Sequence, residues 1–242
     1  MSVSSRVVLP ETLDFLAPDD PRATRSRRDL RRVHRTMRTV SVVKDALRRL
    51  NLASPPRRVL ELGGGDASLL LRLAKALRPR WPDVSLTVLD RHDVVGAQTR
   101  AAYHTLGWQL HVTRQDALEW ATGLKTQHYD LCISSLFLHH FDDEALPGLL
   151  RAIAASCDGF IACEPRRNTL SHLGSRIIGV IGANRVTRED AVTSVAAGFK
   201  GQELTALWPN DEQRWSCREY PALPFTHCFA AVLDKVAMRL SG

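Results

Sequence analysis

The stretch RVLELGGGDA, residues 58–67, decides how this chain folds. A short apolar strand ends in an acidic residue and runs into a glycine-rich turn, and a helical pattern follows at once. Glycine lacks a Cβ, so it can adopt a positive φ and lets a ligand approach the main chain closely. This order of elements predicts a site for a nucleotide-type cofactor at the turn.

The chain after this stretch alternates strand-like and helix-like segments. Parallel strands need crossover helices, so the alternation predicts an α/β fold with a doubly wound, mostly parallel sheet. Beyond Glu164 two more helices are expected, followed by two final strands joined by a long polar loop, which makes seven strands. The expected strands are 58–62, 84–90, 109–113, 129–134, 159–164, 201–207 and 225–233, and the expected helices are 66–77, 94–106, 142–156, 168–181 and 188–197.

Positive charge is concentrated in one segment. The chain has 242 residues and a formal net charge of +7, yet residues 22–50 carry eleven Arg or Lys against two Asp. The rest of the chain is therefore slightly acidic, which argues against a nucleic-acid-binding surface spread over the protein. Apolar residues recur on one face of this segment, and a Pro-Pro pair breaks the chain after it. We expect an N-terminal arm with a basic helical lid over 1–54 and a single catalytic-type domain over 55–242.

Composition indicates a cytoplasmic protein. Hydrophobic residues make up 44% of the chain, which is ordinary for a globular protein, and no apolar run approaches the roughly 18–20 residues of a membrane span. The first residues contain no apolar segment typical of a secretory signal. The five cysteines show no C-x-x-C spacing, so we expect free thiols, mostly buried.

The glycine turn lacks one feature of dinucleotide sites. Such sites use G-x-G-x-x-G, and here Ser68 stands where the third glycine would be. Glu61 would repel a pyrophosphate, but it can accept a hydrogen bond from an ammonium group. A cofactor with an amino-acid tail therefore suits the turn better than one with phosphates. A nicotinamide-dependent oxidoreductase that works without the third glycine stays open as an alternative.

Three acidic residues, Glu61, Asp90 and Asp116, follow successive strands. Together with the glycine turn they resemble the motifs of class I S-adenosylmethionine-dependent methyltransferases, over about residues 55–235. The resemblance implies a Rossmann-like methyltransferase fold with S-adenosylmethionine as cofactor, in which Asp90 binds the ribose hydroxyls and Asp116 the adenine amino group. The cofactor-binding residues that it implies are Glu61, Gly63, Gly64, Gly65, Asp90, Arg91, Asp116, Ala117 and Ser134. It places the stretch from Ser134 to Leu136 beside the methionine part.

Structural roles for the same acids remain open. Asp90 could cap a strand end, and Asp116 could cap a short helix over 117–122. A non-catalytic cofactor-binding protein also stays possible, because folds of this kind need no universal catalytic residue. Thr187, with Asp190 three residues later, is expected only to cap the helix that follows.

The segment SSLFLHHF, residues 134–141, carries the candidate catalytic residues. His139 or His140 could act as general base for a phenolic or enolic hydroxyl, because imidazole titrates near neutrality. At the end of the fifth strand, Glu164 could orient an acceptor, and Arg166 or Arg167 could meet an acidic one. The alternative is a strand end limited by Pro165, with solvated arginines. We expect no metal ion.

Resemblance within the family points to a small-molecule acceptor. The segment 134–141 is similar to that of quinone-biosynthesis methyltransferases, and residues 186–209 resemble bacterial methyltransferases of polyketide-type secondary metabolism. N-P-P-Y and D-P-P-Y, the signatures of exocyclic amine methylation, are absent. The resemblance implies O-methylation of a secondary metabolite with an apolar or aromatic body, with C-methylation of a quinone or polyketide precursor as the alternative.

The basic segment 22–50 allows three roles. We favour a lid over the cofactor, with Arg35 or Arg38 reaching its carboxylate. A peripheral contact with an anionic membrane ranks second. RNA binding ranks last, because the segment has no aromatic residue on which bases could stack, and we expect no nucleic-acid partner. The sequence indicates no oligomeric state.

Overall fold

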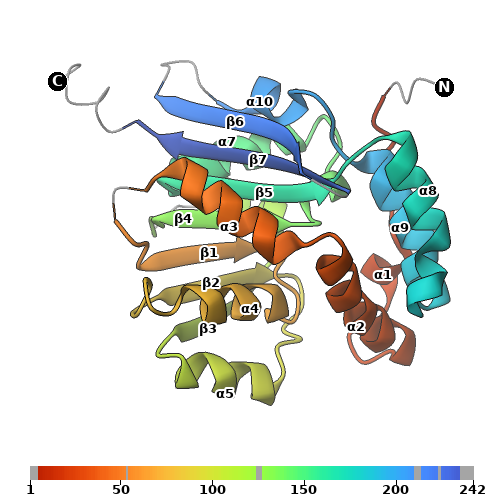
Figure 1. The fold of residues 1–242 in the computed structure, drawn as a ribbon, viewed down its shortest axis with the longest axis horizontal. Helices are drawn as coiled ribbons and strands as arrows, with labels where there is room; N and C mark the ends of the chain where they lie inside the picture. Colours follow the sequence, from red (N-terminus) through yellow and green to blue (C-terminus); the bar gives the residue numbers. More distant parts are fainter. Residues whose placement is uncertain (1–4, 53, 124–126, 210–213, 223–224, 235–242) are drawn as a thin grey trace.

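The computed structural model describes residues 5–52, 54–123, 127–209, 214–222 and 225–234. Its centre is one seven-stranded sheet in the order β3-β2-β1-β4-β5-β7-β6, shown in Figure 1. The first five strands are parallel, and β7 runs antiparallel to both β5 and β6. The predicted doubly wound, mostly parallel fold is therefore confirmed. The strands are β1 Arg58–Leu62, β2 Ser85–Asp90, β3 Gln109–Arg114, β4 Leu131–Ser135, β5 Gly159–Pro165, β6 Trp215–Ala222 and β7 Thr226–Leu233.

Helices cover both faces of the sheet and one of its ends. In Figure 1, α3, α4 and α5 lie in front of the sheet, whereas α7 and α10 lie behind it. A third group, formed by α1, α2, α8 and α9, gathers beyond the carboxyl ends of the parallel strands (Figure 1). The helices are α1 Thr12–Phe15, α2 Pro21–Thr36, α3 Thr39–Leu50, α4 Ser68–Leu77, α5 Ala97–Thr105, α6 Ala117–Thr122, α7 Leu146–Ser156, α8 Thr169–Ile177, α9 Arg185–Ala197 and α10 Glu203–Leu207, with 3₁₀ turns η1 Leu138–His140 and η2 Ile178–Ile181.

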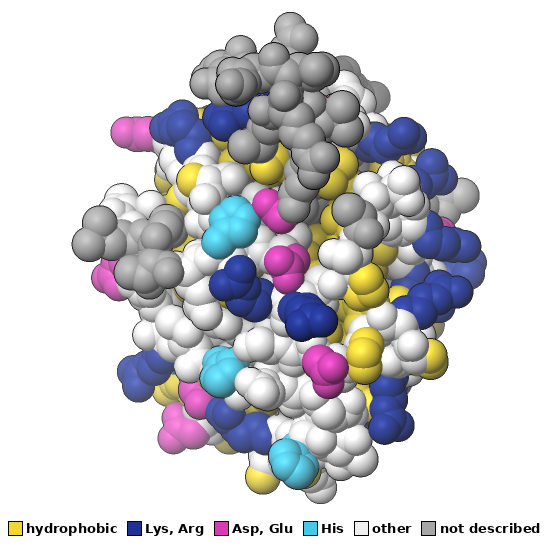
Figure 2. Space-filling view, turned by 90° about the vertical axis from the view of Figure 1, so that its left-hand side faces the viewer, with side chains coloured by type: hydrophobic (Ala, Val, Ile, Leu, Met, Phe, Trp, Pro, Cys, Tyr) yellow, Lys and Arg dark blue, Asp and Glu magenta, His cyan; other side chains and the backbone are white. Residues whose placement is uncertain are grey.

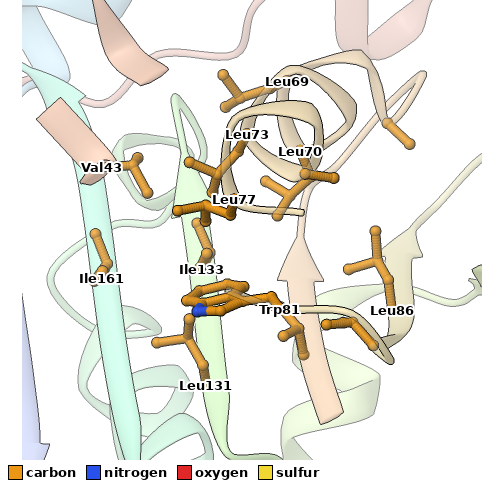
Figure 3. Packing of buried hydrophobic residues seen from close by; sticks show 14 of the residues in the cluster. Val43, Leu69, Leu70, Leu73, Leu77, Trp81, Leu86, Leu131, Ile133 and Ile161 are labelled. Atoms are coloured by element: carbon orange, nitrogen blue, oxygen red, sulfur yellow. The ribbon is translucent and has the colours of Figure 1, made fainter. Parts of the chain in front are cut away.

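The core on the front face is built around α4. Leucines at helical spacing give this helix an apolar stripe, which packs on the side chains of the central strands. Figure 3 shows the stripe above β4, with Trp81 filling the space below it. The labelled residues are Val43, Leu69, Leu70, Leu73, Leu77, Trp81, Leu86, Leu131, Ile133 and Ile161, and all of them are buried.

The basic segment forms two helices with different surroundings. They meet at Arg38, which adopts the left-handed conformation with φ 52°. Helix α3 buries Val42, Val43 and Ala46 in the front core, so it belongs to the layered body of the fold. Helix α2 instead packs against α4 and α9 at the end of the sheet. The apolar stripe of residues 22–50 is thus used mainly for packing.

The predicted sixth strand was wrong. Residues 201–207 turn at Gly201, with φ +62°, and continue as helix α10. The backbone N–H groups of Leu204 and Thr205 in its first turn donate to the carboxylate of Glu219, 3.1 and 2.7 Å away. The sixth strand is β6, which lay in the expected polar loop. It is the edge strand, half exposed and containing Pro221, so its sequence lacks the apolar run of a buried strand.

The predicted cap of the helix after 187 was also wrong. Helix α9 begins at Arg185, and the side chain of Asn184 accepts the backbone N–H of Thr187 as its N-cap. Thr187 itself is buried, and its hydroxyl hydrogen-bonds to Ser26 of α2 at 2.8 Å. Asp190 accepts the backbone N–H of Thr12 at 2.8 Å, so both residues hold the N-terminal segment against α9.

All five cysteines are free thiols, and only Cys217 is not fully buried. Within the part of the chain that the structure describes, no helix is both long enough and apolar enough to span a membrane.

We expect Leu70→Ala to lower the free energy of unfolding by about 2–5 kcal/mol, because it removes buried methyl groups and leaves a cavity. Leu70 is fully buried in the front core. Leu170→Ala, at a side chain that is 56% exposed, should change stability by less than about 0.5 kcal/mol. Urea unfolding followed by circular dichroism measures both, and similar losses for the two variants would contradict this account of the core.

Candidate cofactor and acceptor site

One large cavity, of about 910 Å³, lies at the carboxyl ends of the parallel strands. In an open α/β sheet ligands bind where the strand order reverses, and here the order reverses between β1 and β4. The turns after β1, β2, β3 and β4 form one wall. Helices α2, α8 and α9 and the segment 8–15 form the opposite wall.

The glycine turn is shaped by close contact. Gly63 has φ +64°, and a Cβ at this position would come within 2.1 Å of the Phe137 ring. A Cβ on Gly64 would come within 2.8 Å of Glu61 Oε2. Gly65, with φ +52°, has open space where its Cβ would be. The first two glycines are therefore required by packing, and the third leaves the backbone open to the cavity.

Glu61 is a buried carboxyl group that lines the cavity. Its Oε2 is buried and has no hydrogen-bond partner. Burial raises the pKa of the Glu61 carboxyl well above its ordinary value, and the negative charges of Asp66 and Asp90 raise it further. A buried acid without a partner is costly, so the position suits a ligand that brings a positive charge or a hydrogen-bond donor.

Asp90 connects the second strand to the glycine turn. The backbone N–H of Gly65 donates to its Oδ2 at 2.9 Å, and the N–H of His92 donates to its Oδ1 at 3.0 Å. Asp90 lines the cavity, as does its neighbour Arg91. The guanidinium of Arg91 pairs with Asp14 at 3.1 Å, which ties this wall of the cavity to the N-terminal segment.

Asp116 is both a helix cap and a cavity residue. Its Oδ1 accepts the backbone N–H groups of Leu118 and Glu119 at 2.8 and 3.3 Å, which makes it the N-cap of α6. Both bonds use the same oxygen, and Asp116 and Ala117 line the cavity. The capping role is therefore compatible with ligand binding.

Ser134 does not reach the cavity. It is completely buried inside β4, paired in register with Leu62 and Ala162. Side chains alternate along a strand, and it is the next residues, Ser135 and Leu136, that line the cavity. Of the expected stretch from Ser134 to Leu136, the last two residues therefore line the cavity and Ser134 does not.

Glu164 holds the loop after β4. Its carboxylate, fully buried at the end of β5, accepts the backbone N–H of Leu138 at 3.0 Å and of Phe137 at 3.2 Å. It also meets His139 Nδ1 at 2.8 Å. Glu164, which was expected to orient an acceptor, thus positions protein groups. Arg167, which was expected to meet an acidic acceptor, is buried and pairs with Glu203 of α10 instead.

His139 lies between two carboxylates. Its Nδ1 faces Glu164, and its Nε2 lies 3.3 Å from Oε1 of Glu11. Burial lowers its pKa, but the hydrogen bonds and negative charges of Glu11 and Glu164 outweigh that effect and raise the pKa to about 9. His139 is therefore protonated near neutral pH, with both ring nitrogens occupied, which makes it a poor general base.

His140 has a different environment. Its ring is tilted by 32° against that of His139, with centroids 4.4 Å apart. Nδ1 lies 3.3 Å from Asp14 Oδ2, whereas Nε2 is 4.0 Å from Glu11, beyond hydrogen-bond distance. A neutral ring with its proton on Nδ1, beside Asp14, would leave the lone pair on Nε2. The structure thus separates the two histidines that the sequence left equivalent.

The central part of the chain matches a known protein family. Residues 59–158 match the model of a family described as a methyltransferase domain. This part of the chain is therefore a methyltransferase domain. The match confirms the prediction of a methyltransferase over the nicotinamide alternative. No curated protein sequence matches the chain.

Solved methyltransferases share the fold of this domain and its surroundings. The plantazolicin methyltransferase BpumL in complex with S-adenosylhomocysteine is 13% identical, with a TM-score of 0.65, over 89% of this chain and 91% of that chain. Magnesium protoporphyrin IX methyltransferase from Synechocystis PCC 6803 is 20% identical, with a TM-score of 0.54, over 85% and 86%. An O-methyltransferase family protein from Burkholderia thailandensis is 16% identical, with a TM-score of 0.58, over 89% of this chain and 60% of that one.

Two residues outside the methyltransferase domain complete the site and were missed from the sequence. Glu11 and Asp14 belong to the N-terminal arm, and they contact His139 and His140. The hydroxyl of Ser194 on α9 donates to Glu11. No sequence motif around Glu11 or Asp14 predicts these contacts, because they join positions more than 100 residues apart in the chain.

Glu11, His139 and His140 also have the residue types of a metal site. Within the described ranges they form a group whose ligand atoms all lie within 4.8 Å of one another. In this structure the three side chains are engaged by ion pairing among themselves and with Glu164 and Asp14. The expectation that the site works without a metal ion stays a prediction.

We expect Gly63→Ala to weaken binding of S-adenosylhomocysteine at least tenfold, because the new Cβ would displace Phe137 and a left-handed residue other than glycine costs about 1–2 kcal/mol. Gly148→Ala, on helix α7 where a Cβ meets nothing within 4 Å, is the matched control and should bind normally. Isothermal titration calorimetry measures both affinities. Unchanged affinity in Gly63→Ala would show that the turn does not shape the site.

We expect Glu61→Gln to remove a pH dependence of stability in the cofactor-free protein. A carboxyl group with a raised pKa in the folded state contributes stability below its unfolded value of 4.5 and loses it as the pH rises, by up to about 1.4 kcal/mol per unit. The melting temperature of the wild type should therefore fall relative to Glu61→Gln between pH 5 and pH 8. Glu144→Gln, at an exposed position, is the control, and parallel curves for wild type and Glu61→Gln would refute the assignment.

Proposed function

We propose that this protein transfers the methyl group of S-adenosylmethionine to a phenolic or enolic hydroxyl of a small molecule with an apolar body. The observation that carries the proposal is that two unlike groups of residues line one cavity. The glycine turn, Glu61 and Asp90 form one group, and the His140–Asp14 pair, which joins the loop after β4 to the segment 8–15, forms the other. We also propose a cytoplasmic location, which the five free thiols favour.

The residues around the glycine turn fit S-adenosylmethionine. Glu61 has an unpartnered buried oxygen that suits the ammonium group of the methionine part. Arg31 of α2 lines the cavity and lies 3.7 Å from Asp66, so it is better placed than Arg35 or Arg38 to meet the carboxylate. Asp90 would hold the ribose and Asp116 the adenine. Solved proteins of the same fold contain S-adenosylhomocysteine, the product that methyl transfer leaves from S-adenosylmethionine, which supports this assignment.

His140 is the proposed general base. Asp14 holds its Nδ1–H, so Nε2 can take the proton of the acceptor hydroxyl. The acceptor oxygen then forms a bond to the methyl carbon while the carbon–sulfur bond breaks, and S-adenosylhomocysteine leaves as a neutral thioether. The main contribution of the cavity is to align oxygen, carbon and sulfur.

His139 acts as a positioning residue. Held in its charged form between Glu164 and Glu11, it ties the loop after β4 to the segment around residue 11. This segment also carries Asp14. Through that link the buried ion pairs fix the orientation of His140, although His139 does not reach the acceptor.

We expect His140→Gln to lower kcat by about 10²–10⁴-fold while KM for S-adenosylmethionine stays within a few-fold. His139→Gln should instead lower the melting temperature, because it leaves Glu164 and Glu11 buried without their cation. His104→Gln, on the exposed side of α5, is the control for a surface histidine. Turnover is measured with S-adenosylmethionine labelled in the methyl group and a panel of phenols, enols and quinols. A His140→Gln enzyme with near-wild-type kcat would rule out this base.

Nuclear magnetic resonance of the labelled product decides the site of methylation. A methoxy carbon is the expected result. A methyl carbon attached to a ring or chain carbon would overturn O-methylation and establish the C-methylation alternative, with His140 removing the proton from the carbon instead. Binding of S-adenosylhomocysteine without turnover of any acceptor would favour a non-catalytic protein.

A further inference from the structure

The large apolar side chains exposed on the described part of the chain gather around the mouth of the cavity. Five of the eight, namely Leu9, Phe15, Leu118, Ile177 and Val180, line the cavity itself. Two more, Leu170 and Leu173, lie on α8, whose C-terminal residue is Ile177. Exposed apolar groups that cluster at one place indicate an interaction surface.

Helix α8 and turn η2 present most of this surface. Leu170, Leu173, Ile177 and Val180 follow one another at helical spacing and are 56%, 59%, 57% and 87% exposed. The buried residues of α8, Ser171 and Ser175, are small and polar. The helix thus turns its polar side inward and its apolar side outward, the reverse of an ordinary surface helix.

A basic surface adjoins this apolar face. Helix α2 buries Ala23, Ser26 and Asp29 toward α9. Its outward side is almost entirely basic, and Arg32 Nη1 lies 3.9 Å from where a Cβ on Gly182 would stand, directly after η2. The exposed arginines of α2 are Arg22, Arg25, Arg28, Arg31, Arg32 and Arg35.

The opposite end of the molecule has a different character. Figure 2 shows the face at the amino ends of the parallel strands, where basic, acidic and histidine side chains are mixed with scattered apolar ones. Exposed aliphatic side chains beside a helix with a basic outward side, α2, are therefore found at the cavity end of the molecule. An anionic lipid surface offers the complementary combination of negative headgroups and acyl chains.

We propose that the cavity mouth docks on an anionic lipid bilayer and takes its methyl acceptor from it. The apolar side chains of α8 and η2 enter the boundary between headgroups and acyl chains, while the arginines of α2 contact the headgroups. The acceptor is then an amphiphile whose hydroxyl-bearing head reaches His140 and whose alkyl chain leaves through the mouth past Ile177 and Val180. The acceptor part of this proposal rests on the proposed function, whereas the docking part does not.

Vesicle flotation tests the docking. Wild-type protein should bind vesicles of phosphatidylcholine with 30% phosphatidylglycerol at least tenfold more strongly than pure phosphatidylcholine vesicles, and 0.5 M salt should reduce the difference. Leu170→Asp/Leu173→Asp and Arg25→Gln/Arg28→Gln should each lower the partition coefficient roughly tenfold or more. None of these four residues lines the cavity, so binding of S-adenosylhomocysteine should be unchanged. Gln98→Asp, an exposed position on α5, controls for added negative charge.

Two outcomes would overturn the docking. One is wild-type binding that is equal for anionic and neutral vesicles. The other is a wild-type dimer in light scattering that Leu170→Asp/Leu173→Asp dissociates, since the apolar face would then be covered by a second copy of the chain. Either result leaves methyl transfer to soluble phenols untouched, so it is distinguishable from failure of the proposed function.

A series of 4-alkylphenols dispersed in the anionic vesicles tests the acceptor class. KM should fall as the alkyl chain lengthens, and Leu170→Asp/Leu173→Asp should raise KM for the long-chain members several-fold without changing kcat for phenol itself. A KM that does not depend on chain length would refute an acceptor drawn from the bilayer. Absence of methylation with every member, together with normal vesicle binding, would refute the proposed function and leave the docking supported.

Discussion

The buried carboxylate of Glu164 is the interaction on which the site depends. It sits at the end of a central strand and collects the backbone N–H groups of the loop after β4 together with the ring of His139. These hydrogen bonds hold the loop so that the Phe137 ring lies against Gly63, and the ring in turn shapes the glycine turn. Hydrogen bonds to an ionised group are stronger than neutral ones, and removing such a carboxylate would leave several buried donors unsatisfied.

The same carboxylate reaches the N-terminal segment through a charged histidine. His139 carries a proton between Glu164 and Glu11, and the segment around Glu11 is further held by Asp190 on α9. A buried ion pair adds little net stability where the cost of desolvation offsets the attraction between the charges. Its effect here is to bring Asp14 to His140, so that the group proposed to accept a proton is oriented by a part of the chain outside the methyltransferase domain.

The cavity end of the molecule combines this polar centre with an apolar rim. Helix α8 packs its serines inward and leaves its aliphatic residues outside, which a helix serving only as a lid over a water-soluble substrate would have no physical reason to do. Helix α3, by contrast, uses its apolar residues in the core. The basic segment therefore divides into one helix that builds the fold and one that presents charge beside the cavity mouth.

The sequence alone determined the five parallel strands, the glycine turn and the acids after the strands, because these depend on local periodicity and on spacing from a strand end. It failed at β6 and α10, where an edge strand has no buried run and the helix is capped by Glu219 from that strand. It placed Ser134 at the cavity because the sequence does not show which of two neighbouring strand residues faces the cavity. Only the tertiary structure separated His139 from His140, since their difference comes from Glu11, Asp14 and Glu164, whose contacts with them are set by how distant segments pack.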